Sequence, residues 1–70
     1  MADAIDIVPA DMITPGCWFR KQQGTHMYQR ITDTSAKQVG LDVREHIYAT
    51  SNGNIIAVKR NTRVVALHGI

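Results

Sequence analysis

Residues 41–59 read LDVREHIYATSNGNIIAVK, and this stretch decides the fold class. Apolar and polar residues alternate along 41–50, which is the period of a half-buried strand. Glu45 interrupts the apolar side, which allows a bulge or a sheet edge at that point. The Asn52-Gly53 pair that follows is the strongest short-range signal for a β-hairpin, and residues 55–59 then form the returning strand. A helix over 41–50 is the competing interpretation, but β-branched residues and the following turn favour a strand.

The sequence on both sides of this hairpin predicts three further strands. Residues 17–21, 26–32 and 63–67 are rich in β-forming residues and are bounded by turn signals. Thr14-Pro15-Gly16 is one such turn, because Pro fixes φ and Gly supplies a positive φ. The loop 22–25 joins the first two strands into a hairpin. Five short strands predict an all-β fold, either a small closed barrel or a strongly bent antiparallel sheet.

The remaining segments are short. Residues 5–7 form a short extended segment, and 9–12 form a single helical turn. The polar residues 33–37 are expected to be a connector without regular structure.

The order of these elements resembles that of small bacterial and phage proteins with SH3-like β-barrels. The resemblance spans roughly residues 11–67. It rests on residues 11–16 leading into Trp18-Phe19, on residues 28–31, and on residues 61–67. It implies a five-stranded SH3-like barrel, and members with an assigned function bind peptides, other proteins or nucleic acids. The peptide-binding kind uses a dense aromatic and acidic groove, which this composition does not provide.

Length and composition bound the kind of protein. The 70 residues predict a single domain, 1–70, in which residues 1–4 are expected to fray. A net charge of +2 neither supports nor excludes a nucleic-acid partner. Because Cys17 is the single cysteine, no intrachain disulfide forms, which favours a reducing, cytoplasmic location. No signal peptide and no apolar run of membrane-spanning length are present, so no membrane association is expected.

No pattern predicts catalysis, a cofactor or a metal site. The three histidines, His26, His46 and His68, do not stand at zinc-ligand spacings with Cys17 or with one another. Phosphate-binding glycine loops are also missing. Cys17 has no neighbouring pattern of a catalytic pair and is expected to behave as a small buried apolar residue. The sequence therefore predicts a protein that is not an enzyme.

One face of the sheet is the candidate binding surface. If the strands are neighbours, alternate positions bring rings and arginines to one side. Such a mixture suits nucleic acid, since rings stack on bases and guanidinium groups neutralise phosphates. It also suits a protein partner, because Trp, Tyr and Arg dominate protein hot spots. The candidate residues are Trp18, Arg20, Tyr28, Arg30, Arg44, His46 and Tyr48.

The register of the first hairpin decides whether this face exists, because a slip of one residue turns every side chain over. If Lys21 pairs with His26, Phe19 faces Tyr28 and the common face does not form. If Gln22 pairs with His26, Arg20 faces Tyr28 instead. The loop sequence permits both registers.

A second basic group surrounds the last corner of the chain. Lys59, Arg60 and Arg63 are interpreted as a solvated turn whose charges protect an apolar strand from unwanted pairing.

The first functional interpretation is a non-enzymatic interaction module that binds a protein partner or associates with itself. So small a chain buries little surface alone, and a second copy is a simple way to bury more. The alternative is a nucleic-acid-binding module that uses the aromatic and arginine face. Salt distinguishes them, because phosphate contacts weaken steeply with ionic strength.

Overall fold

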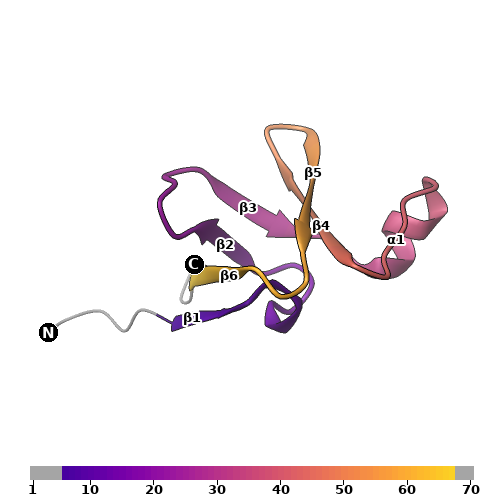
Figure 1. Ribbon diagram of the computed structural model, residues 1–70. Coiled ribbons are helices and arrows are strands. Elements are labelled where there is room, and N and C mark those ends of the chain that lie inside the picture. Colours follow the sequence, from indigo (N-terminus) through magenta and orange to yellow (C-terminus); the bar gives the residue numbers. More distant parts are fainter. Residues whose placement is uncertain (1–5, 68–70) are drawn as a thin grey trace, which may run out of the picture.

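The computed structural model describes residues 6–67, whose six strands form one antiparallel sheet (Figure 1). The order across the sheet is β1-β6-β2-β3-β4-β5. The strands are β1 (Asp6–Pro9), β2 (Trp18–Lys21), β3 (Met27–Arg30), β4 (His46–Ser51), β5 (Asn54–Lys59) and β6 (Arg63–Leu67). A 3-10 turn, η1 (Ala10–Met12), and a short helix, α1 (Asp33–Gln38), complete the described elements. The predicted all-β class is confirmed.

The sheet is open, with β1 and β5 as its two edges. Of the two predicted arrangements, the closed five-stranded barrel is therefore wrong in two respects, whereas the alternative of a bent antiparallel sheet agrees with the open sheet observed. The strand count is six, because the extended segment near the start becomes β1 and pairs with β6 from Asp6 opposite Ala66 to Pro9 opposite Arg63. In addition, no described strand joins the two edges to each other.

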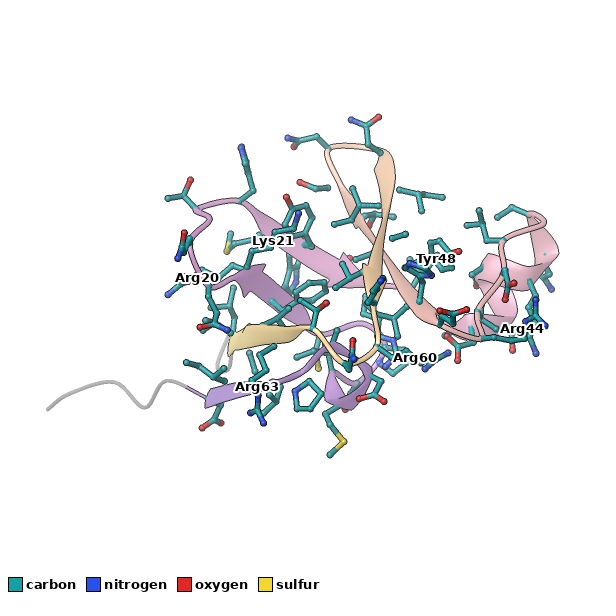
Figure 2. All side chains as sticks on the ribbon, in the orientation of Figure 1. Arg20, Lys21, Arg44, Tyr48, Arg60 and Arg63 are labelled. Carbon is teal, nitrogen blue, oxygen red and sulfur yellow. The ribbon has the colours of Figure 1, made fainter. Side chains whose placement is uncertain are left out.

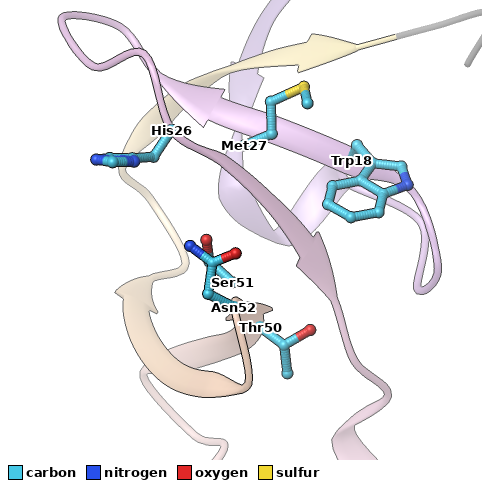
Figure 3. A pocket seen from close by; sticks show the side chains of 6 residues that line it. All are labelled: Trp18, His26, Met27, Thr50, Ser51 and Asn52. Carbon is cyan, nitrogen blue, oxygen red and sulfur yellow. The ribbon is translucent and has the colours of Figure 1, made fainter.

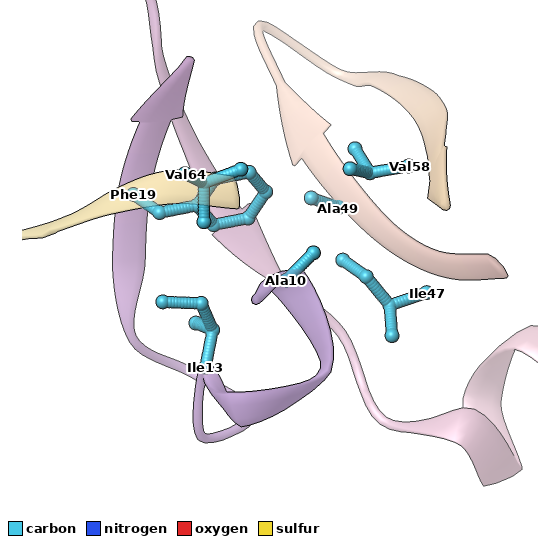
Figure 4. Close-up of a cluster of buried hydrophobic side chains, with 7 residues drawn as sticks. All are labelled: Ala10, Ile13, Phe19, Ile47, Ala49, Val58 and Val64. Atoms are coloured by element: carbon cyan, nitrogen blue, oxygen red, sulfur yellow. The ribbon is translucent and has the colours of Figure 1, made fainter. Parts of the chain in front are cut away.

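The sheet nevertheless curves around a single apolar core (Figure 4). We call the face that carries Phe19 and Ile47 the inner face, and the opposite one the outer face. Phe19 lies on β2 and Ile47 on β4, yet both belong to one buried cluster. Because side chains from opposite parts of one sheet meet only if the sheet bends, this cluster sets its curvature. The cluster consists of Ala10, Ile13, Phe19, Ile47, Ala49, Val58 and Val64.

The hairpin at Asn52-Gly53 forms as predicted. Asn52 has φ 53° and Gly53 has φ 81°, the two positive values of a type I′ turn, and Ser51 pairs with Asn54 across it. The strand before it, however, begins at His46 rather than at residue 41. Asp42 accepts the backbone N–H of Arg44 at 2.9 Å, and this local turn diverts residues 41–45 from the sheet.

The predicted polar connector after β3 is instead the helix α1. Thr32 caps its first turn, where its Oγ1 accepts the backbone N–H of Ser35 at 3.0 Å. Gly40 follows the helix with φ 86°, a conformation that favours glycine at a helix end. The helix packs on β4, and its residue Ala36 is fully buried.

Candidate functional site

The first hairpin adopts the register that separates the predicted binding residues. Phe19 lies opposite Tyr28, and their ring centroids are 5.8 Å apart. Trp18 lies opposite Gln29, and Arg20 opposite Met27. Since paired residues share a face, Trp18 and Arg20 point to the outer face whereas Tyr28 lies on the inner one. The predicted single face of rings and arginines therefore does not form.

Arg20 holds the loop that sets this register. Its Nη1 donates to the carbonyl oxygens of Lys21 at 3.1 Å, Gln22 at 3.1 Å and Gly24 at 3.4 Å. The backbone N–H of Gly24 also donates to the carbonyl of Lys21 at 3.1 Å. The guanidinium group thus bonds three carbonyls of the loop, including those of Gln22 and Gly24. The charged group of Arg20 therefore binds the loop. The side chain lies on the outer face, beside Trp18.

Arg30 is a buried structural residue. Its side chain is 7% exposed, and Nη1 donates to the carbonyl oxygens of Ile13 at 2.6 Å and Asp11 at 3.2 Å. These bonds fasten the end of η1 to β3. A buried guanidinium group needs such partners, because an uncompensated buried charge is costly. Arg30 is therefore not placed to contact a phosphate or a partner.

Asp33 joins Arg30 to Arg60. Its Oδ1 lies 3.3 Å from Nη2 of Arg30, and its Oδ2 lies 2.9 Å from Nη2 of Arg60. Arg60 also donates from Nε to the carbonyl of Val43 at 2.9 Å. Partial burial opposes ionisation of Asp33, but the hydrogen bond and charge of Arg60, with those of Arg30, hold its pKa below the ordinary value. Arg60 is thus a half-buried partner in this network, whereas the sequence placed it in a solvated turn.

The lowered pKa of Asp33 predicts a loss of stability in acid. A carboxyl whose pKa is lower in the folded than in the unfolded chain stabilises fully above the unfolded pKa of 3.8. That contribution disappears as the pH falls from 3.8 through the lower folded value. We expect the thermal midpoint of Asp33→Asn to fall less between pH 5 and pH 2.5 than that of the unchanged chain, as followed by circular dichroism. Equal falls would show that other carboxyls account for the acid sensitivity.

Of the remaining three candidates, His46 and Tyr48 share the outer face of β4, whereas Arg44 lies before the strand begins. Arg44 is exposed, and its Nη2 lies 2.8 Å from Oδ2 of Asp42. Hydrogen bonds from Arg44 lower the pKa of Asp42 to about 2. Tyr48 is 9% exposed, and its hydroxyl donates to the carbonyl of Asp42 at 2.7 Å. It lies on the outer face, where the hydroxyl fixes the segment that follows α1. His46 is half-buried at the start of β4, opposite Lys59.

The positive charges are dispersed over the molecule. Figure 2 shows Arg20 and Lys21 at one end and Arg44 at the other. Lys59 and Arg63 are exposed near the last corner, as the sequence predicted. Within residues 6–67, these side chains do not form the continuous basic groove that tracks a nucleic-acid backbone.

A hollow with a volume of about 350 Å³ lies on the outer face (Figure 3). Trp18 and His26 lie at its opposite ends, with Met27 between them. The β4–β5 turn faces them with hydroxyl and amide groups. The residues that line it are Trp18, His26, Met27, Thr50, Ser51 and Asn52.

Sequence reasoning identified one member of this hollow, Trp18. Met27 and Asn52 were not predicted as members, for two different reasons. Met27 shares the outer face with Trp18 only in the observed register, and Asn52 was treated solely as a turn residue. The hollow combines the Trp18 ring and the Met27 thioether with the imidazole of His26 and with hydroxyl and amide groups.

Other sequence expectations have structural outcomes. Cys17 is exposed, so its interpretation as a buried apolar residue is wrong. Within residues 6–67, no three His, Cys, Asp or Glu side chains gather as a metal site requires, and His68 lies outside the described residues. The helices in that range are too short and polar to cross a membrane.

Comparisons of this chain with protein-family models, with curated proteins and with solved structures give no match.

Proposed function

We propose that this chain is a non-enzymatic, SH3-like interaction module that binds an extended segment of a protein partner across the outer-face hollow. The observation that carries the proposal is the hollow itself. There, Trp18 is half-exposed and Met27 is 49% exposed beside neutral polar groups. Large apolar side chains left in contact with water at a concave place are typical of a binding surface.

Two local features support the SH3-like description. A turn at residues 14–17 leads into β2, where Gly16 has φ 91° and the N–H of Cys17 donates to the carbonyl of Thr14 at 2.9 Å. A short corner joins β5 to β6, closed by the N–H of Thr62 on the carbonyl of Lys59 at 3.0 Å. Both are features that the family resemblance implies.

The chemistry of the lining indicates the kind of ligand. An apolar side chain of the partner fits between the Trp18 ring and the Met27 thioether. The amide of Asn52 and the hydroxyl of Ser51 can donate to and accept from peptide groups. Because no carboxylate or guanidinium group lines the hollow, we expect the bound segment to be neutral at its centre.

The use of the arginines favours a protein over a nucleic acid. Arg30 is buried, Arg60 binds Asp33, and Arg44 binds Asp42. Each of these guanidinium groups already has an anionic partner or a set of carbonyls. A nucleic-acid interface on the outer face would have to rely on Arg20, which is also engaged with its loop, and on Lys59 at the end of β5.

The test uses peptides selected from a phage-displayed library of random sequences. Selected peptides are titrated while the fluorescence of Trp18, the single tryptophan, is recorded. We expect saturable changes whose midpoint moves little with salt, since the contact is centred on apolar groups. A mixed single-stranded oligonucleotide is titrated in parallel at low and moderate salt. The proposal would be contradicted if no peptide bound and the oligonucleotide quenched the fluorescence in a way that weakened steeply with salt. That result would favour the nucleic-acid hypothesis.

We expect Trp18→Ala to weaken peptide binding roughly 30-fold, as loss of an aromatic hot spot does. The control is Lys59→Ala, because Lys59 is exposed and does not line the hollow. Isothermal calorimetry measures both variants, since the first lacks the fluorophore. Equal effects of the two substitutions would show that the peptide does not bind at the hollow.

A further inference from the structure

The edge strand β5 presents unpaired backbone to solvent. It pairs with β4 on one side and has no strand on the other within residues 6–67. Its sequence, NIIAVK, contains neither proline nor glycine, and Ile55 is 49% exposed. Figure 1 shows the β4–β5 hairpin rising away from β2 and β3. Such an apolar edge is a template for pairing with another strand.

The turn geometry tells which backbone groups point outward. In a two-residue hairpin the residues that flank the turn, here Ser51 and Asn54, exchange both backbone hydrogen bonds, and every second pair does so afterwards. The residues of β5 in the other positions direct their N–H and C=O groups away from β4. These are Ile55, Ala57 and Lys59, of which Lys59 offers only its N–H, because its carbonyl already accepts the N–H of Thr62 at 3.0 Å.

The opposite edge is less suited to pairing. β1 has only four residues, carries the charged Asp6 and ends at Pro9, which has no N–H to donate. Charge, shortness and proline are the usual means of protecting an edge strand. β5 has one such device, Lys59, and that residue stands at its end.

We propose that β5 pairs with β5 of a second copy of this chain, antiparallel and about a two-fold axis at Ala57. This pairing continues the sheet from one copy into the other. It does not use Trp18 or Met27, so it goes beyond the proposed peptide-binding function. The occupant is a second copy because the strand is complementary to itself in one register.

That register follows from the residues. An axis at Ala57 places the two small Ala57 side chains beside each other and Ile55 opposite Lys59 of the second copy. On the inner face, Ile56 then lies opposite Val58 of the second copy and extends the apolar layer. An axis at Lys59 would bring two ammonium groups together, which is destabilising. An axis at Ile55 would leave the end of β5 unpaired.

The interface is small, so we expect a weak, concentration-dependent dimer. Sedimentation equilibrium of the chain is expected to show monomer at about 10 μM and a growing dimer fraction toward about 1 mM. A chain that remains monomeric throughout, or that forms larger species without a dimer, would overturn the proposal.

Two matched substitutions at Ile55 test the register. Ile55→Lys places an ammonium group opposite Lys59 of the second copy, at two symmetric positions, and we expect the dimer to weaken at least about tenfold. Ile55→Glu places a carboxylate there instead and is expected to keep the dimer. Equal weakening by both would overturn this register. Both changes are made at a half-exposed position, so the fold is retained.

Ala57→Pro provides a second, independent block. Proline removes an outward N–H but no bond to β4, and edge positions of this kind accept it. We expect it to abolish the dimer and to leave peptide binding at the hollow unchanged. Loss of the dimer and loss of peptide binding are therefore separate results, so either proposal can fail while the other stands. A dimer that persists in Ala57→Pro would contradict pairing at this edge.

Discussion

Replacing Arg30 with methionine is expected to lower the free energy of unfolding by about 3 kcal/mol or more, which leaves the chain largely unfolded. Arg30 is 7% exposed and supplies hydrogen bonds to the carbonyls of Ile13 and Asp11. Methionine fills similar space but leaves those carbonyls without their donor and leaves the carboxylate of Asp33 with Arg60 alone. Buried polar groups that lose a partner carry the full cost of their desolvation.

Two variants control this experiment. Arg44→Met also removes an arginine, but from an exposed ion pair with Asp42, and is expected to leave the thermal midpoint unchanged. Arg30→Lys keeps the charge without the planar fork, so we expect an intermediate effect. Urea denaturation followed by circular dichroism measures all three. If Arg30→Met and Arg44→Met unfold alike, the buried network does not stabilise the fold.

Phe19→Ala is expected to cost about 3–5 kcal/mol, comparable with the whole stability of a domain this size. Phe19 is fully buried and lies at the centre of the inner-face cluster with Val64 and Ile47. Removal of its ring leaves a cavity that a small curved sheet has few side chains to fill. We expect Phe19→Ala to show no cooperative unfolding at 25 °C.

The matched control is Met27→Ala on the outer face, where the side chain is 49% exposed, with an expected change of about 0.5 kcal/mol or less. Phe19→Leu keeps most of the volume and should lose less than about 1.5 kcal/mol. Thermal melts followed by circular dichroism give the comparison. A cooperative melt of Phe19→Ala at the temperature of the unchanged chain would mean that the core lies elsewhere.

Local signals in the sequence were enough to predict the second hairpin and the last strand. The Asn52-Gly53 turn has the predicted type, and β6 has the predicted bounds, because turn chemistry and β-branched residues act over a few residues. The errors arose where another local interaction competed. The carboxylate of Asp42 turns the chain and interrupts an apparently regular alternation. Thr32 caps a helix in a segment whose polarity alone suggested a loop.

The arrangement of the candidate site could not be predicted from short segments of the sequence. A register difference of one residue separates a common aromatic face from the observed arrangement, and the loop 22–25 permits both. Arg30 is buried because carbonyls of η1 come to lie beside it, from residues far away in the sequence. Tyr48 is 9% exposed, and its hydroxyl bonds the carbonyl of Asp42, in the segment that follows α1. No pattern in the sequence encodes these contacts.

The place of β6 in the sheet also decides when the chain folds during its synthesis. β6 is the last of the strands described within residues 6–67 to be made, yet it lies between β1 and β2. A nascent chain that has reached Lys59 holds β2 to β5 but leaves β1 without a partner and Phe19 without Val64. The native sheet therefore forms only after β6 has left the ribosome. Because its pairings join residues far apart in the sequence, folding is slower than for a helical chain of this length.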